Sequence, residues 1–436
     1  MDDQRLTIKQ KAYALLLCSV VFAVVYNASM WHVSSLPNVQ SFVFDFEKNI
    51  PFLIWTIVPY MTSGVFLCLI FLLCKTKKQL RLLTKRMLFI TVVAGLCFVI
   101  FPLRFLMPKP DVSQSFLGFS FHFLEIFDSP FNQSPSLHIA YAYVFWTIFR
   151  TIKGNMRTFL MLWLILLGIS TLTTYQHHFL DILTGSILAH LSFIVFPEGK
   201  NEFEFRNFQV ANYYFLCAWF LALISLLLTQ FYGMFWLALL WPALVMMIVG
   251  YQYQKNHVGF LKDQSGKIAF YKRIFYLPYL IIYWIFVISL RKNRRPVEIL
   301  PRLFISSRLD INDLKYFKPD ERTTVYDLSA EIEENPEIRK TAEYFSFPYL
   351  DIGTFDIAET RKLVTHITEK YSRLPDDGKI LIHCTMGYTR CTVIATLVMK
   401  NILSLPTDEA ITKIKSLHRN YILHPYAADF LKKINL

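Results

Sequence analysis

The sequence predicts a multi-pass α-helical membrane domain followed by an α/β domain, and three observations support this fold class. Hydrophobic residues make up 54% of the 436-residue chain and the mean hydropathy is +0.37, which excludes a disordered chain and indicates several membrane spans. The first 295 residues hold 26 basic and 12 acidic side chains, whereas the remainder holds 19 and 20. From Pro296 onward the apolar runs give way to short strand-like and amphipathic helical segments.

Nine apolar runs are candidates for membrane helices. The first eight are interpreted as runs of spanning length, and the ninth is short and contains Pro278. We expect a membrane domain over 1–210 with its core at 87–196, additional helices and a linker over 211–295, and an α/β domain over 296–436. The runs cover 12–31, 51–74, 87–103, 136–150, 158–175, 178–196, 211–230, 233–252 and 274–290.

Basic loops predict the orientation of these helices. The loop "KTKKQLRLLTKR" (75–86) has six basic residues and no acid, so we expect it in the cytoplasm. Segments 32–50 and 104–135 and the turn at Tyr175 then lie outside. The ninth run is basic on both flanks, "YKR" before it and "RKNRR" after it, so it either spans or lies in the interface. We favour the interface, which leaves the tail on the cytoplasmic side. No stretch forms a basic face for nucleic acid, and no nucleic-acid partner is expected.

The tail contains a strand, a loop and a helix that suit phosphate chemistry. "KILIHC" (379–384) reads as a strand, "TMGYT" as the loop, and a helix begins at Arg390. Such a loop directs backbone N–H groups and a helix N-terminus at one point, which binds a dianion and favours the thiolate of Cys384. Gly387 permits a tight turn, and Arg390 can hold two phosphate oxygens. These residues suit attack of Cys384 on a phosphate ester through a thiophosphate intermediate.

This stretch resembles the signature His-Cys-x-x-Gly-x-x-Arg of the protein tyrosine and dual-specificity phosphatases, over about 297–436. The resemblance implies Cys384 as nucleophile, Arg390 as phosphate clamp and an upstream Asp as general acid. Asp351 is preferred over Asp356, which can instead cap the following helix. Most members of the family have Ser or Thr directly after the Arg, where this chain has Cys391. That departure could slow hydrolysis or allow a disulfide with Cys384.

Polar patches at three edges of the membrane half suggest a second site. Arg104 and Lys109 follow the third run and could neutralise phosphate, while "NQSPSLH" (132–138) precedes the fourth run. "TYQHHFLD" (174–181) lies between the fifth and sixth runs. On a helix His177 and Asp181 share a face, so one histidine can attack phosphorus while the carboxylate orients it. A second histidine, His138, can then protonate the leaving oxygen.

Together these patches resemble the PAP2 lipid-phosphatase superfamily, with its core of about six helices matched over roughly 87–196. The resemblance implies His177 as nucleophile, Asp181 as its orienting group and His138 as general acid, and it implies that Ser136 and Ser170 contact phosphate. Leu137 and Thr171 depart from the family pattern. Leu137 and the adjacent histidines also resemble enzymes that transfer a phospho-headgroup between lipids, so a headgroup phosphotransferase is the alternative for this half.

The arrangement of the whole chain resembles bacterial fusions of a PAP2 domain with a dual-specificity phosphatase domain. It implies a multi-pass protein of the bacterial inner (plasma) membrane that hydrolyses phosphoric monoesters at two sites. Expected substrates are lipid phosphates or phosphorylated headgroups in the membrane, with a phosphoprotein as another possibility for the tail. No cofactor and no metal is expected, because no carboxylate cluster has metal-ligand spacing. The alternative of another class is a membrane scaffold whose tail binds phosphate without turnover.

Overall fold

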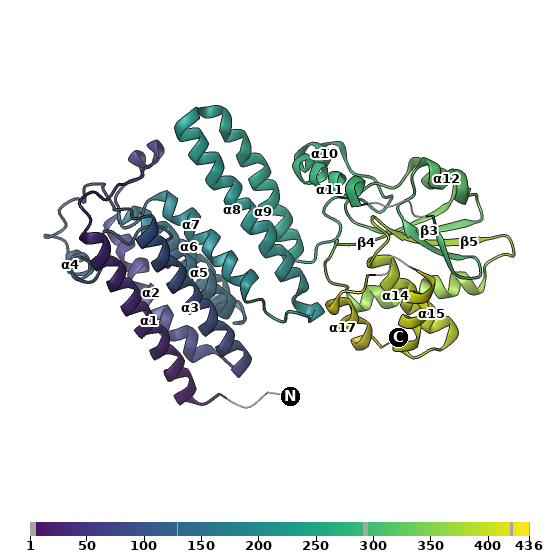
Figure 1. Ribbon diagram of the computed structural model, residues 1–436, viewed down its shortest axis with the longest axis horizontal. Coiled ribbons are helices and arrows are strands. Elements are labelled where there is room, and N and C mark those ends of the chain that lie inside the picture. The colour runs from purple at the N-terminus through teal and green to yellow at the C-terminus, as the bar shows by residue number, and fades with distance from the viewer. Residues whose placement is uncertain (1–5, 129, 291–294, 419–421, 436) are drawn as a thin grey trace. The chain divides into compact units, whose positions relative to one another are not determined.

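A computed structural model describes residues 6–128, 130–290, 295–418 and 422–435, and Figure 1 shows its helices and strands. The chain divides into two compact units, which we describe separately. The first comprises Met1–Glu198 and Phe215–Ala243, and the second comprises Gly199–Tyr214 and Leu244–Leu436. The second unit therefore includes segments upstream of Pro296. The basic flank 291–294 of the ninth apolar run lies outside the described residues.

The first unit is helical, as its apolar runs predict. Each of the nine predicted runs coincides with an apolar helix, and six helical segments among the described residues are long and apolar enough to cross a membrane. Helices α5, α7 and α11 are shorter, so the number of crossings stays a prediction. The apolar helices of this unit are α1 (Ile8–Ser34), α2 (Ile57–Leu73), α3 (Lys77–Ile100), α5 (Leu137–Phe149), α6 (Asn155–Thr173), α7 (Phe179–Val195) and most of α8 (Arg206–Tyr232). Most of α9 (Leu240–Gln254) and all of α11 (Leu277–Leu290) belong to the second unit.

Helix α5 is the centre of this unit, because it packs against α2, α3, α6 and α7. A close approach between α5 and α7 depends on Gly185, where a Cβ atom would lie 2.6 Å from the Ser136 carbonyl oxygen. A further helix, α4 (Gly118–Phe127), was not predicted; it lies in the segment expected to be an outside loop. Short 3₁₀ helices occur at Asp45–Asn49, Ile54–Thr56, Phe203–Phe205 and Met234–Leu239.

The second unit contains a five-stranded sheet in the order β1-β2-β5-β3-β4, with β1 antiparallel to β2 and the other pairs parallel. The predicted strands 325–329 and 379–384 correspond to β3 and β5, whereas β1, β2 and β4 were not singled out. Parallel strands place their carboxyl ends on one edge, which brings the end of β5 beside the ends of β2 and β3. The strands are β1 (Val297–Leu300), β2 (Leu303–Ser307), β3 (Thr323–Ser329), β4 (Glu343–Tyr349) and β5 (Lys379–Cys384).

Helices cover both faces of this sheet. Apolar side chains that alternate along its strands are therefore buried on either side. Helices α12 and α13 pack on one face, and α14 to α17 pack on the other (Figure 1). The helices predicted over 357–374 and 390–403 correspond to α14 and α15. The bounds in this unit are α10 (Phe270–Phe275), α12 (Ile311–Phe317), α13 (Pro336–Thr341), α14 (Ile357–Ser372), α15 (Arg390–Leu403), α16 (Thr407–Leu417) and α17 (Pro425–Lys433).

Candidate functional site

In the first unit, His177 and Asp181 lie close together at the start of α7. Helix α6 ends at Thr173, and the left-handed backbone of Tyr175 (φ 55°) turns the chain so that the His177 N–H donates to the Thr171 carbonyl at 3.0 Å. The His177 Nδ1 atom then lies 3.2 Å from the Asp181 Oδ2 atom, and Asp181 is buried. A buried carboxylate at this distance fixes one imidazole tautomer and leaves Nε2 available for reaction.

His138 faces this pair from the first turn of α5. The Ser136 hydroxyl caps that helix, and the Ser136 N–H donates to the Asp181 carbonyl at 3.0 Å, which ties α5 to α7. The rings of His138 and His177 have their centroids 5.7 Å apart. Two imidazoles at this separation can flank one phosphoryl group, and the N-terminus of α5 favours an anion there.

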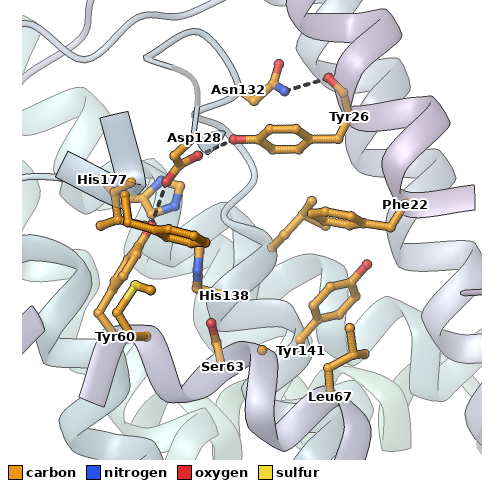
Figure 2. A pocket seen from close by; sticks show the side chains of 15 residues that line it. Phe22, Tyr26, Tyr60, Ser63, Leu67, Asp128, Asn132, His138, Tyr141 and His177 are labelled. Atoms are coloured by element: carbon orange, nitrogen blue, oxygen red, sulfur yellow. Dashed lines mark hydrogen bonds between the residues drawn. The ribbon is translucent and has the colours of Figure 1, made fainter. Parts of the chain in front are cut away.

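Both histidines line a cavity of about 320 Å³ (Figure 2). Figure 2 also shows Asp128, which sequence reasoning missed, held by the hydroxyls of Tyr26 and Tyr60. The Tyr60 hydroxyl donates to Asp128 Oδ2 at 2.9 Å, and its ring stacks on His138 with centroids 4.3 Å apart. Tyr60 therefore orients the His138 ring by stacking, while its own hydroxyl is held by the half-buried Asp128 carboxylate.

The four candidate phosphate-binding residues of this half lie outside the described lining of that cavity. Lys109 Nζ donates to Gln176 Oε1 at 3.1 Å, one residue before the proposed nucleophile. Arg104 is exposed. The hydroxyls of Ser136 and Ser170 are buried at helix backbone, and Ser170 donates to the Leu167 carbonyl at 2.6 Å.

A second histidine–carboxylate pair adjoins the first, and sequence reasoning missed its acid. The His178 Nδ1 atom lies 3.1 Å from Glu47 Oε2, and both side chains are buried. The same carboxylate accepts the N–H of Phe179 at 2.9 Å, at the start of α7. Glu47 therefore holds the segment that carries His177. An acid 131 residues away in the sequence gives no local signal for this pairing.

In the second unit, the loop after β5 surrounds the sulfur of Cys384. The Gly387 N–H donates to this sulfur at 3.2 Å. Gly387 has φ 71°, and a Cβ atom there would lie 2.6 Å from the Ser307 nitrogen on β2, so only glycine fits without movement. The predicted tight turn is present at Gly387, next to the sulfur of Cys384, and its role toward phosphate stays a prediction.

Arg390 begins α15 and is buried among polar groups. Its Nη1 atom donates to Glu331 Oε2 at 2.8 Å, and its Nη2 atom lies 3.1 Å from Asp351 Oδ1. Asp356 instead caps α14 by accepting the Glu359 N–H at 2.9 Å, which is the alternative role that its position suggested. Glu331 was not predicted, although it lies just beyond the end of β3, on the edge where β5 also ends.

The Cys391 thiol lies 3.7 Å from the Cys384 sulfur, and both are buried. Burial favours the neutral thiol of Cys384, but a hydrogen bond from Cys391, the charge of Arg390 and the N–H groups of Cys391 and Gly387 outweigh it. Together they lower the pKa of Cys384 to about 6. The hydrogen bond to Cys384, burial and the charge of the Cys384 thiolate raise the pKa of Cys391, so it stays a neutral donor.

A buried charged cluster supports the end of β5. His383 contacts Glu334 and lies 3.9 Å from an oxygen of Asp327, and Lys262 pairs with that same carboxylate. Burial opposes a charged imidazole, but the two carboxylates outweigh it and raise the pKa of His383. The acids and His383 are close enough to hold a metal ion. However, the Lys262 ammonium already binds Asp327 and the Ser329 carbonyl, so the cluster fits an ion-pair network better.

Comparison with known families supports a phosphatase in the membrane half. The model of the PAP2 superfamily matches residues 53–195, about a third of the chain, and this range contains both histidines and Asp181. The match begins upstream of the predicted core at 87. It supports the expectation of a phosphoric monoester hydrolase with membrane-capable helices. No curated protein matches the chain.

Solved structures resemble about a third of the chain. The active form of Tk-PTP is 17% identical over 32% of this chain and 95% of its own, with a TM-score of 0.29. Human DUSP28 is 16% identical over 33% and 94%, with a TM-score of 0.28. A human tyrosine phosphatase-like serine/threonine/tyrosine-interacting protein is 13% identical over 32% and 95%, with a TM-score of 0.26. At these values the likeness carries no conclusion about activity or substrate.

Proposed function

We propose that this chain is a membrane phosphatase with two phosphoester-hydrolysing sites. The observation that carries the proposal is that each site pairs a nucleophile with the group that activates it. His177 lies 3.2 Å from the Asp181 carboxylate, and the sulfur of Cys384 accepts the Gly387 N–H at 3.2 Å. The first pair lies in the range that the PAP2 superfamily model matches.

At the membrane site, Nε2 of His177 attacks phosphorus and the bond from phosphorus to the leaving oxygen breaks. Asp181 keeps the proton on Nδ1 and stabilises the charge that develops on the ring. His138 donates a proton to the leaving oxygen and then takes one from the water that cleaves the phosphohistidine. Lys109, which contacts the neighbouring Gln176, supplies positive charge for the phosphate oxygens.

At the tail site, the Cys384 thiolate attacks phosphorus while Asp351 protonates the leaving oxygen. Arg390 and the loop N–H groups hold the phosphate oxygens, with Glu331 fixing the guanidinium. Water then attacks the thiophosphate, Asp351 accepts its proton, and the thiolate leaves with its electron pair.

We propose that this tail lies on the cytoplasmic side of a bacterial inner membrane. The test is a reporter fused after Leu436 that works only outside the cytoplasm. Activity of this reporter would contradict the proposed placement.

Phosphate release by the purified full chain tests the two-site proposal. The substrates are phosphatidic acid and phosphatidylglycerophosphate in mixed micelles, together with a phosphotyrosine peptide. We expect His177→Ala and Cys384→Ser each to remove a separate part of the activity, by about 10³-fold or more, and the double variant to release none. Headgroup exchange between lipids without phosphate release would instead favour the transferase, and phosphate binding without either reaction would favour the scaffold.

A further inference from the structure

Helix α11 contacts the tail site directly, although its sequence reads as a membrane segment. The Tyr283 hydroxyl lies 3.2 Å from Nη2 of Arg390, the atom that also faces Asp351 and Thr385. Farther along, the Tyr388 hydroxyl donates to the Leu290 carbonyl at 3.2 Å. Two contacts with the loop 384–390 show that α11 forms one wall of this site.

A cavity of about 770 Å³ lies between α11 and the edge of the sheet. One wall is an apolar stripe of α11 that includes Leu280, Trp284 and Ile288, at the spacing of one helix face. Another part of the wall is polar and contains Glu331 and Thr385. Both of these polar residues bind Arg390, so the cavity opens onto the phosphate loop. Its volume is typical of sites for small amphipathic ligands.

Several other side chains of α11 are apolar and exposed. Ile285 and Phe286 are more than half exposed, and so is Trp284 at the rim of the cavity. The helix has 14 residues and is about 21 Å long, short of the ~30 Å hydrocarbon core, and Lys272 and Arg273 lie just before it. A short apolar helix with basic residues at its end suits the bilayer interface.

We infer that α11 presents the Cys384 site to the bilayer, and that its substrate is a lipid with a phosphomonoester headgroup. The phosphate binds the loop 384–390, while the apolar part adjoining the headgroup lies along the Leu280–Trp284–Ile288 stripe. This inference rests on the proposed function of the tail site, and it names the substrate class. A phosphoprotein would not need an apolar wall that continues into an exposed apolar helix.

The test uses the full chain with His177→Ala, so that the membrane site is silent. Hydrolysis of phosphatidylglycerophosphate in nanodiscs is compared with that of soluble p-nitrophenyl phosphate and of a phosphotyrosine peptide. Trp284→Ala removes the apolar wall, and we expect kcat/KM for the lipid to fall about tenfold or more, because a large apolar contact is lost. Hydrolysis of p-nitrophenyl phosphate should not change. Tyr316→Ala, a similarly exposed aromatic on α12 outside the lining of the cavity, is the matched control and should leave both rates unchanged.

The outcomes separate this inference from the proposed function. An equal fall for lipid and p-nitrophenyl phosphate with Trp284→Ala would show a structural role and overturn the lipid assignment. Preferred turnover of the phosphopeptide, unaffected by Trp284→Ala, would also overturn it in favour of a protein substrate. If Cys384→Ser leaves p-nitrophenyl phosphate hydrolysis intact in the same background, the proposed tail activity itself fails.

Discussion

The ionisation of Cys384 is the most direct test of the tail site. Its pKa of about 6, against an ordinary value of 9.0, changes the ionised fraction strongly near neutrality. At pH 7 a thiol with the lower value is about 90% thiolate, whereas one with the ordinary value is about 1% thiolate, a difference of about a hundredfold. The rate of alkylation by iodoacetamide follows the thiolate, so it should rise through pH ~6 and level off above pH ~7.

The assay measures modification of Cys384 by mass spectrometry of the full chain between about pH 5 and pH 9. Two substitutions at Cys391 form a matched pair. Cys391→Ala removes the nearest side-chain donor, so we expect the midpoint to shift to higher pH. Cys391→Ser keeps a donor at the same position and should keep the midpoint low. A wild-type rate that still rises with a midpoint near pH 9, or an unchanged midpoint in Cys391→Ala, would refute the reasoning.

Three further substitutions test the supporting residues. Lys262→Met leaves Asp327 buried without its partner and should destabilise the second unit by about 3–5 kcal/mol in thermal unfolding. The control Lys255→Met, at an exposed lysine, should have little effect. A melting temperature of Lys262→Met equal to that of the wild type would argue against a stabilising ion pair. Gly387→Ala should lower p-nitrophenyl phosphate hydrolysis at least about tenfold without loss of helical circular dichroism, because its Cβ would meet the backbone of β2. Asp181→Asn should lower phosphate release at the membrane site by about 10²–10⁴-fold while tail activity is retained; near-normal release would remove Asp181 from the mechanism.

Features that depend on local spacing could be predicted from the sequence. The strand, loop and helix around Cys384 follow from a β-branched apolar run, a glycine and an apolar helical period, and α15 begins at Arg390 as expected. His177 and Asp181 are four residues apart, and the structure places their side chains 3.2 Å apart. In both cases the information lies within one turn or one loop.

The missed residues come from separate elements and carry no local pattern. Glu331 reaches Arg390 from 59 positions away, and Glu47 reaches His178 from 131. Asp128 is held beside the membrane cavity by hydrogen bonds from tyrosine hydroxyls on two other helices. No local motif distinguishes these acids from ordinary surface acids, which are usually solvated. Only the packing of the helices and strands determines that these carboxylates are buried against the site.

The basic flanks of α11 left two alternatives, a span or an interfacial helix, and the contacts of Tyr283 bear on that choice. A helix that spans exposes its whole surface to lipid or to other helices. Tyr279 and Tyr283 instead are buried within the second unit, and Tyr283 reaches the guanidinium of Arg390. These contacts place α11 against the loop of the tail site, and the choice between a spanning and an interfacial helix stays a prediction.

In the mechanism that we propose for the tail site, Cys391 acts differently on the two steps of the reaction. As a neutral thiol 3.7 Å from Cys384, it can donate to the thiolate and favour the first step, the attack on phosphorus. A thiol is a weaker donor than a hydroxyl and makes longer hydrogen bonds. A hydroxyl occupies this position in most of the phosphatases that the signature resembles. Cys391 therefore stabilises the departing Cys384 thiolate less well when water cleaves the thiophosphate. In this proposed mechanism, Cys391 keeps the nucleophile ionised. The step that it slows relative to Ser or Thr is hydrolysis of the thiophosphate.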